Sequence, residues 1–460
     1  MSDSYDVVVI GAGPTGENAA DRAVRGGLTA VVVESELVGG ECSYWACMPS
    51  KALLRPVAAV AEAEHVAGVW GTRLDPRAVL ARRDSFTSHW KDDGQVSWLE
   101  DEHVDLVRGH GRLAGERCVS VGSAQLQARH AVVICTGSRA LIPPVHGLAD
   151  ARPWTSREVT SSQVVPPRLA VIGGGVVGCE MAAAWQALGT EVTLLVRGER
   201  LLPRMETFAG DMVAEALGAA GVDVRRNAAV TGAQRPSADG PVSLQMDGEA
   251  LEADEVLVAA GRAPRTDDLG LESVGLSPGS WLDVDDTCQV SGVDGGWLYA
   301  AGDVNHLALL THMGKYQGRI CGDAIAARAR GEDVAVTAWA NHSVVPQVIF
   351  TIPEVAAVGL SLAQAQAAGL TVRAVDYDIG AVAGAGLFAD SYAGRARMVV
   401  DEDNKVIVGM TLVGPGVGEM IHAATVAVAG RVPLDRLWHA VPSYPTISEV
   451  WLRLLETYGL

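Results

Sequence analysis

Two cysteines stand five residues apart in residues 39–51, which read GGECSYWACMPSK. Cys42 and Cys47 could form a redox pair, because a thiolate attacks disulfides and two neighbouring thiols can close one. On a straight helix their Cα atoms would lie roughly 8 to 9 Å apart, beyond the about 7 Å that a disulfide spans. We therefore expect an irregular backbone between them, with Pro49 tolerated by a helix only in its first turn.

The remaining five cysteines show no such spacing. Seven cysteines in 460 residues is a modest and odd number, unlike that of a disulfide-stapled secreted protein. We interpret the scattered ones as buried, small apolar residues. None of the histidines has metal-ligand spacing with a second donor, so no metal site is expected.

A dinucleotide-binding unit is expected in residues 5–35, which read YDVVVIGAGPTGENAADRAVRGGLTAVVVES. The pattern predicts an apolar strand, a glycine-rich turn, an alanine-rich helix and a second strand that ends at Glu34. Gly11 and Gly13 permit a tight turn and close approach of a pyrophosphate, and Gly16 permits the helix to pack on the strand. The N–H groups of the helix N-terminus would bind the anion, and Glu34 would accept from ribose hydroxyls.

The same pattern recurs in residues 168–204. Its three glycines are Gly173, Gly175 and Gly178. The second strand is followed not by an acid but by Arg197 and Arg200, and guanidinium groups there suit a 2′-phosphate. This favours NADPH over NADH, although a solvated basic loop would have the same composition.

Two such units in one chain suggest two nucleotides, typically a flavin and a nicotinamide, with a hydride passing from one to the other. Electrons then need an exit from the flavin. The cysteine pair follows the first unit directly and is the obvious candidate.

The composition limits the partners. A formal net charge of −19 and an isoelectric point near 5 argue against binding to nucleic acid or to an anionic membrane surface. The first strand begins within a few residues of Met1, which leaves no room for a signal peptide, and no apolar run is long enough to span a bilayer. We expect a cytoplasmic protein of about three domains.

The chain resembles the pyridine nucleotide-disulfide oxidoreductases, the flavoprotein family of glutathione reductase, dihydrolipoamide dehydrogenase and mercuric reductase. The resemblance rests on the two glycine motifs, the cysteine segment and a further series in the family's order. This series is VVICTGSRALIPP, LVAAGRAPRT, YAAGDVNHLALLTHMGKYQGRI, VPQVIFTIPEVAAVGLS and SYPTISEVW.

The resemblance implies an α/β fold with two Rossmann-like dinucleotide-binding domains and a C-terminal α+β dimerisation domain. The expected divisions are an FAD domain at 1–150 and 266–332, an NAD(P)H domain at 151–265 and an interface domain at 333–460. It also implies a homodimer whose active site is shared across the interface. Apolar spacing agrees, since residues 395–414 alternate like strands and residues 418–430 have helical spacing.

The resemblance also assigns site residues. Cys47 would be the charge-transfer thiol beside the flavin and Cys42 the thiol that attacks the substrate. Lys51 would lie by the flavin and pair with Glu180, and Asp303 would bind the flavin nucleotide. Further cofactor contacts would come from Gly40, His110, Thr136, Gly137 and Gly261.

Two features depart from the family pattern. The segment YPTISE places Tyr444 where the family has a catalytic histidine, and a phenol with a pKa of about 10 is a poor base near neutrality. Glu449 matches the glutamate that would orient the histidine and could bond Tyr444 instead. His439 or water are the other candidate proton carriers. The residues between the cysteines, SYWA, are also bulkier than usual.

Three functions remain compatible with these features. The leading one is reduction of a small disulfide or related electrophile by NADPH through FAD and the cysteine pair. In the second, electrons leave the flavin directly for a quinone, dye or metal ion. In the third, the chain is a dihydrolipoamide dehydrogenase-type subunit of a 2-oxoacid dehydrogenase complex.

Overall fold

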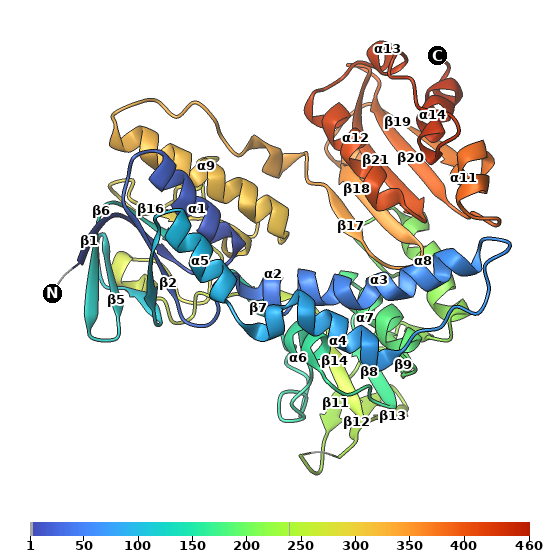
Figure 1. The fold of residues 1–460 in the computed structure, drawn as a ribbon, viewed down its shortest axis with the longest axis horizontal. Helices are drawn as coiled ribbons and strands as arrows, with labels where there is room; N and C mark the ends of the chain where they lie inside the picture. Colours follow the sequence, from blue (N-terminus) through green and yellow to red (C-terminus); the bar gives the residue numbers. More distant parts are fainter. Residues whose placement is uncertain (1–2, 239) are drawn as a thin grey trace. The chain divides into compact units, whose positions relative to one another are not determined.

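The computed structural model describes residues 3–238 and 240–460, which form two compact units (Figure 1). Unit 1 comprises Met1–Pro49, Asp84–Leu141 and Arg262–His342, and unit 2 comprises Ser50–Arg83, Ile142–Gly261 and Ser343–Leu460. The finer three-domain boundaries stay a prediction. No helix within the described residues is long and apolar enough to cross a membrane.

Unit 1 is built on a seven-stranded sheet in the order β3-β2-β1-β6-β5-β4, with β16 beside β6. The strands are β1 (Asp3–Ile10), β2 (Ala30–Glu34), β3 (Asp105–Arg108), β4 (Gly111–Leu113), β5 (Cys118–Val121), β6 (Ala124–Ile134) and β16 (Leu298–Ala300). The pairs β1–β2, β2–β3, β1–β6 and β6–β16 are parallel, whereas β4, β5 and β6 pair antiparallel.

Both faces of strand β1 are buried. Val7 and Val9 belong to one apolar cluster, whereas Val8 and Ile10 belong to another on the opposite face. Alternate side chains of a strand point to opposite faces, so an uninterrupted apolar run is what a sheet covered on both sides requires. Helices α1 (Pro14–Arg25) and α9 (Thr311–Ala329) lie side by side over the first face (Figure 1).

The cysteine segment folds as two short stretches of helix with a break between them. Helix α2 (Gly40–Tyr44) ends at Trp45, whose φ of −138° leaves the helical region, and helix α3 (Cys47–Glu64) starts afresh. Pro49 is in the first turn of α3, where its missing N–H costs no hydrogen bond. The predicted irregularity between the two cysteines is confirmed.

Unit 2 contains a four-stranded parallel sheet in the order β10-β9-β8-β14. Its strands are β8 (Arg168–Ile172), β9 (Glu191–Val196), β10 (Asp223–Arg226) and β14 (Glu255–Val258), and its helices include α7 (Val176–Ala187) and α8 (Thr207–Ala219). An antiparallel sheet of β11 (Gly232–Gln234), β12 (Val242–Met246) and β13 (Glu249–Ala253) adjoins it in sequence. Trp185 of α7 is fully buried in the main core.

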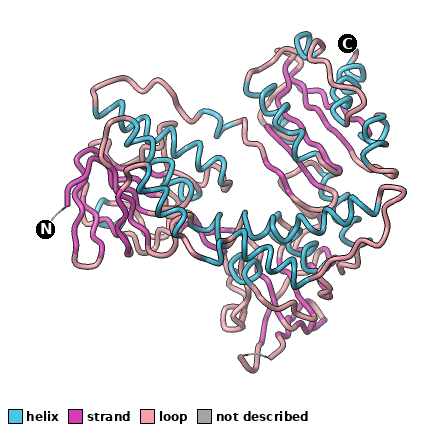
Figure 2. Tube along the Cα trace, viewed as in Figure 1, coloured by secondary structure: helices cyan, strands magenta, loops and turns pink. Residues whose placement is uncertain are grey.

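The C-terminal part of unit 2 is a five-stranded antiparallel sheet in the order β17-β18-β21-β20-β19 (Figure 2). Its strands are β17 (Gln347–Ile349), β18 (Glu354–Gly359), β19 (Val372–Asp378), β20 (Arg395–Asp401) and β21 (Val406–Gly414). Helix α12 (Val417–Ala429) packs on β18 and β21, and α14 (Val450–Tyr458) packs along β19. The strands expected in 395–414 and the helix expected in 418–430 are confirmed.

Helix α7 approaches β8 closely at one glycine. A Cβ atom on Gly178 would lie 1.9 Å from the carbonyl oxygen of Gly173, which is backbone and cannot move aside cheaply. Gly218, near the end of α8, is exposed and has open space around it.

Replacement of Gly178 by alanine is expected to lower the free energy of unfolding by about 1 to 3 kcal/mol, because the helix must move off the strand. Gly218→Ala is the matched control and is expected to be neutral or to stabilise by up to about 1 kcal/mol, as alanine favours helix. Thermal unfolding of the two variants and the wild type checks this. Equal midpoints for Gly178→Ala and the wild type would contradict the close packing.

Glu17 is a half-buried residue in the first turn of α1. Its Oε1 atom has no hydrogen-bond partner among the described residues. Burial raises the pKa of Glu17 to about 7, whereas the positive charge of Lys315 lowers it and the negative charge of Glu34 raises it. The folded protein therefore binds a proton at this site more tightly than the unfolded chain does.

This raised pKa makes stability fall as pH rises. Below the ordinary value of 4.5 the side chain is protonated in both states, and its contribution is lost as pH climbs through about 7. Glu17→Gln is expected to flatten that pH dependence and to stabilise the protein at pH 8 by about 1 to 3 kcal/mol. The control is Glu100→Gln, at an exposed site on α5 (Asp93–Asp101). Denaturation between pH 4 and 8 that gave parallel curves for all three proteins would refute this assignment.

Candidate functional site

The first glycine-rich turn packs against backbone at Gly11 and Gly16 and is open at Gly13. Gly11 has a φ of +100°, and a Cβ there would lie 2.5 Å from the carbonyl oxygen of Cys135. A Cβ on Gly16 would lie 1.9 Å from the carbonyl oxygen of Gly11. Gly13 is the N-cap of α1 with no side-chain cap, and a Cβ on it would meet nothing nearer than 4.0 Å. The open N–H groups at this helix start suit a phosphate.

The surroundings of this turn fit the rest of a dinucleotide. Glu34 ends β2, and its Oε2 and Oε1 accept hydrogen bonds of 2.8 Å from the backbone N–H groups of Ala12 and Glu36. The Thr136 hydroxyl, at the end of β6, is buried without a partner among the described residues. An orphaned buried hydroxyl needs a partner, which a bound nucleotide would supply. These residues fit FAD.

The second glycine-rich turn repeats the geometry. Gly173 has a φ of +121°, and a Cβ there would lie 2.4 Å from the carbonyl oxygen of Ala259. Gly175 is the uncapped N-cap of α7 and has nothing within 4 Å of its Cβ position. The turn therefore offers a second site of the same kind in unit 2.

Two arginines follow the strand beside this second turn. Arg197 and Arg200 come directly after β9, and both are exposed. The Arg200 guanidinium donates to the hydroxyl of Thr207 at 2.6 Å. The Arg197 side chain makes no hydrogen bond or ion pair within the chain as described, so its charge is available to a ligand.

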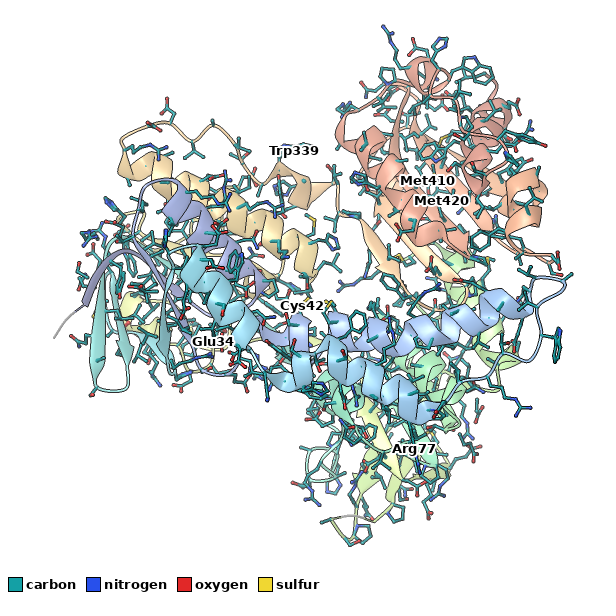
Figure 3. All side chains as sticks on the ribbon, in the orientation of Figure 1. Glu34, Cys42, Arg77, Trp339, Met410 and Met420 are labelled. Atoms are coloured by element: carbon teal, nitrogen blue, oxygen red, sulfur yellow. The ribbon has the colours of Figure 1, made fainter. Side chains whose placement is uncertain are left out.

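The cysteine segment packs directly on the first glycine-rich turn. The backbone N–H of Gly39 donates to the carbonyl oxygen of Ala12 at 2.7 Å. A Cβ on Gly40 would lie 2.9 Å from the Cα atom of Gly13. Gly40 therefore contacts the first glycine-rich turn, and Cys42, the first cysteine of the pair, lies only two residues after Gly40 in the chain (Figure 3).

The two cysteines are present as a reduced dithiol. The Cys47 sulfur lies 3.2 Å from the hydroxyl oxygen of Thr311, the first residue of α9, where the helix dipole favours negative charge. A hydrogen bond with Cys47 and burial raise the pKa of the Cys42 thiol, opposed by Thr311 and Lys315.

Lys51 and Glu180 form an ion pair in unit 2. The Lys51 ammonium donates to Glu180 Oε2 at 2.8 Å, and the backbone N–H of Phe350 donates to Oε1 at 3.0 Å. Glu180 is buried on α7, and the ammonium lies 4.9 Å from the centre of the Phe350 ring. The pairing predicted from the sequence is present, and it holds the end of a flexible side chain in one place.

Asp303 is held by a polar network in unit 1. Its Oδ2 accepts from the Ser138 hydroxyl at 2.5 Å, and Arg262 Nε donates to the same hydroxyl at 2.9 Å. Burial raises the pKa of Asp303, while Ser138 and Arg262 lower it. The fully buried Gln317 accepts from the backbone N–H of Gly302 at 2.7 Å and so fixes the turn that carries Asp303.

Three other predicted positions lie next to short strands. Gly137 and Gly261 have φ values of +70° and +135°, which favour glycine. The His110 ring is held by the backbone oxygen of Asp268 at 2.8 Å. Their contact with a cofactor stays a prediction.

The C-terminal turn differs from one sequence expectation. Tyr444 is 76% exposed and precedes a cis peptide bond to Pro445. Glu449 does not bond Tyr444, and its Oε1 accepts instead from Arg453 at 2.5 Å, one turn further along the chain. Glu449 Oε2 is buried without a partner among the described residues. His439 is exposed.

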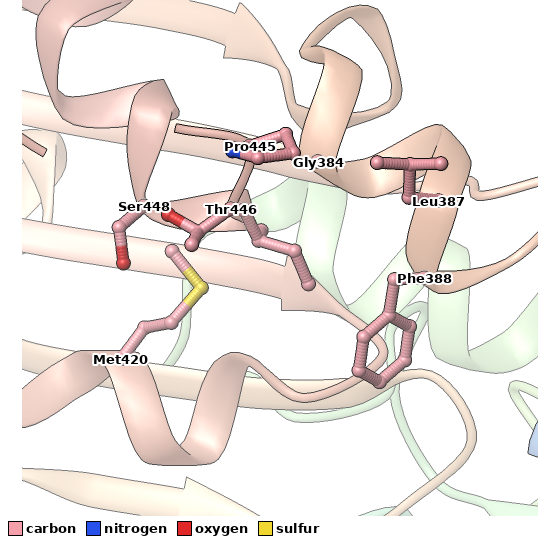
Figure 4. A pocket seen from close by; sticks show the side chains of 8 residues that line it. Gly384, Leu387, Phe388, Met420, Pro445, Thr446 and Ser448 are labelled. Atoms are coloured by element: carbon pink, nitrogen blue, oxygen red, sulfur yellow. The ribbon is translucent and has the colours of Figure 1, made fainter. Parts of the chain in front are cut away.

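An apolar cavity of ≈ 390 Å³ lies beside this turn (Figure 4). It is lined by Leu387 and Phe388 of α11 (Ala383–Phe388), Met420 of α12 and the residues that follow Tyr444.

Sequence reasoning missed several residues of the site. Thr311 contacts Cys47 and Ser138 contacts Asp303 from distant positions in the chain. The charge of Lys315 acts on the Cys42 thiol, and Gln317 bonds the backbone of Gly302 next to Asp303. Only the position of Thr311 at the start of a helical pattern gave a signal.

The comparisons with known proteins cover nearly the whole chain. The family described as pyridine nucleotide-disulphide oxidoreductase matches residues 5–331, and its dimerisation domain matches residues 345–454. Dihydrolipoyl dehydrogenase 3 from Pseudomonas aeruginosa is 36% identical over 98% of this chain and 97% of its own length. A mercuric reductase from Lysinibacillus sphaericus is 29% identical over 97% of this chain and 81% of its own.

A solved structure shares the fold. The HOCl-induced flavoprotein disulfide reductase RclA from Escherichia coli, described as a Cu(II) complex, superposes with a TM-score of 0.85 over 99% of both chains at 22% identity. The dimerisation-domain match supports the expected homodimer. The chain therefore belongs to the pyridine nucleotide-disulphide oxidoreductases and is an FAD- and NAD(P)H-dependent oxidoreductase with the predicted α/β fold.

Proposed function

We propose that this enzyme passes a hydride from NADPH through FAD to the Cys42–Cys47 disulfide, and that the resulting dithiol reduces a small disulfide or related electrophile. The observation that carries the proposal is the packing of the cysteine segment on the first glycine-rich turn. The two backbones lie so close that a Cβ added to Gly40 would be 2.9 Å from the Cα atom of Gly13. A redox pair so close to a nucleotide turn is suited to exchange electrons with the bound flavin.

The dithiol chemistry balances with two cysteines alone. FAD, when bound, accepts the hydride and returns the electron pair to the disulfide. Cys42 as thiolate attacks one sulfur of the acceptor, which breaks its S–S bond and releases the first thiol. The Cys47 thiolate then attacks Cys42, re-forms the protein disulfide and releases the second thiol. One disulfide, one NADPH and one proton give two thiols and NADP⁺.

The surrounding residues are assigned supporting roles. The Thr311 hydroxyl and the start of α9 stabilise negative charge on Cys47. Lys51, held by Glu180, would keep a positive charge beside the flavin. Tyr444 and Glu449 would complete the acceptor site across the dimer interface. Because a phenol is a weak base near neutrality, acceptors that release an acidic thiol should react best.

Two cysteine variants test the function. Anaerobic NADPH is expected to give a long-wavelength charge-transfer band from the Cys47 thiolate to the flavin. Cys42→Ala cannot form the disulfide, so its Cys47 thiolate should give the band with oxidised flavin before NADPH is added, and disulfide reduction should be abolished. Cys47→Ala should give no band. Cys118→Ala, at a half-buried cysteine of β5 in the same unit, is the control and should behave as the wild type.

Absence of the band in the wild type would overturn the dithiol assignment. The similarity to a mercuric reductase favours a second candidate, in which the flavin reduces a metal ion, quinone or dye directly. Such activity would survive Cys42→Ala. The relatives named dihydrolipoyl dehydrogenase suggest a third, a subunit of a 2-oxoacid dehydrogenase complex, which would require co-purification with that complex.

The choice of NADPH rests on Arg197 and Arg200. Their replacement together by alanine is expected to raise the KM for NADPH by about 10- to 100-fold, because two charged contacts to the 2′-phosphate are lost. The KM for NADH should change much less. Arg77→Ala, at an exposed arginine of α4 (Pro76–Phe86), removes one positive charge from unit 2 away from the second glycine-rich turn and serves as a control (Figure 3). Faster flavin reduction by NADH in the wild type would contradict the preference.

A further inference from the structure

An ion pair holds the residue that precedes Cys42 in the chain. Glu41 precedes Cys42 on α2, and its Oε1 accepts from the Arg265 guanidinium at 2.9 Å. The two side chains are 22% and 36% exposed, so solvent screens the pair only in part. Arg265 follows strand β15 (Arg262–Pro264), more than two hundred residues away in the chain.

The same ion pair is joined to the network around Asp303. Arg265 Nε donates to the carbonyl oxygen of Ser138 at 3.3 Å, and Arg262 donates to that oxygen at 2.7 Å. The Ser138 hydroxyl bonds Asp303. Ser138 lies on β7 (Ser138–Ala140), which pairs antiparallel with β15. One two-stranded ribbon therefore connects the helix of Cys42 to the turn of Asp303.

Charge balance gives this connection a consequence for the thiols. Reduction of the disulfide adds a negative charge when the first thiolate forms. Like charges repel, so a carboxylate on the residue that precedes Cys42 disfavours the thiolate unless a cation neutralises that carboxylate. The Arg265 guanidinium cancels the carboxylate and also fixes where it lies.

We propose that Glu41 and Arg265 are positioning residues for the dithiol, which anchor α2 to the β7–β15 ribbon and neutralise a carboxylate beside the reacting thiols. This proposal rests on the proposed function of the cysteine pair. The net charge next to Cys42 depends on both Glu41 and Arg265, because loss of either side chain leaves the charge of the other uncompensated. The two single losses must therefore act in opposite directions.

Arg265→Gln and Glu41→Gln give the test. The measured quantity is the pH at which the charge-transfer band of the NADPH-reduced enzyme is half developed. Arg265→Gln leaves a carboxylate, so the midpoint should rise by about 0.5 pH unit, and Glu41→Gln leaves a guanidinium, so it should fall by a similar amount. The double variant should return to within about 0.2 pH unit of the wild type.

Two further variants separate charge from structure. Arg265→Lys keeps the charge and should keep the wild-type midpoint. Arg139→Gln removes an arginine from the same ribbon, where it pairs with Asp267, and should leave the midpoint unchanged. Shifts of the two single glutamine variants in the same direction, or an Arg265→Lys shift equal to that of Arg265→Gln, would overturn the proposal.

A readout without flavin keeps this test apart from the proposed function. The pH dependence of Cys42 alkylation by iodoacetamide, followed by mass spectrometry, should show the same opposite shifts. If the wild type gave no charge-transfer band, the proposed function would fail. Alkylation profiles that did not move in opposite directions would refute the ion-pair proposal independently of that result.

Discussion

The contact between two glycines is the constraint on which the rest of the site depends. The backbone at Gly40 passes so close to Gly13 that a single Cβ would lie 2.9 Å from a Cα atom. No other residue type fits there without moving the chain. The contact joins the start of α2 to the N-terminus of α1, so the cysteine pair and the phosphate-binding turn are placed by the same few backbone atoms.

Two carboxylates named above are each paired with a cation. Glu180 is buried but accepts from Lys51 and from a backbone N–H, and Glu41 next to the dithiol accepts from Arg265. A buried charge without a partner is costly, so each pair fixes the side chains that carry it. Glu17 lacks such a partner for one oxygen, and its raised pKa is the result.

Local patterns in the sequence predicted the fold and part of the site. Both glycine turns, the helix break before Pro49 and the ion pair of Lys51 follow from short motifs or from the family resemblance, and the structure confirms them. The contact of Thr311 with Cys47 joins residues 264 apart, which no motif encodes. The Tyr444–Glu449 bond considered from the sequence is absent, and Glu449 bonds Arg453 instead. Arg453 is four residues further on, a spacing that helical periodicity alone would have suggested.

The missing histidine changes what the dithiol can do easily. Burial and the charge of Cys47 raise the pKa of Cys42, so the attacking thiol holds its proton when the first thiolate has already formed. In a site with a histidine, the imidazole can accept that proton near neutral pH. Here the corresponding position carries Tyr444, whose side chain is exposed. In the proposed mechanism, disulfide reduction depends on the loss of the Cys42 proton, whereas electron transfer from the flavin to Cys47 does not. An acceptor that takes electrons without a Cys42 thiolate does not require the deprotonation of Cys42. The identity of the acceptor therefore depends on how Cys42 is deprotonated.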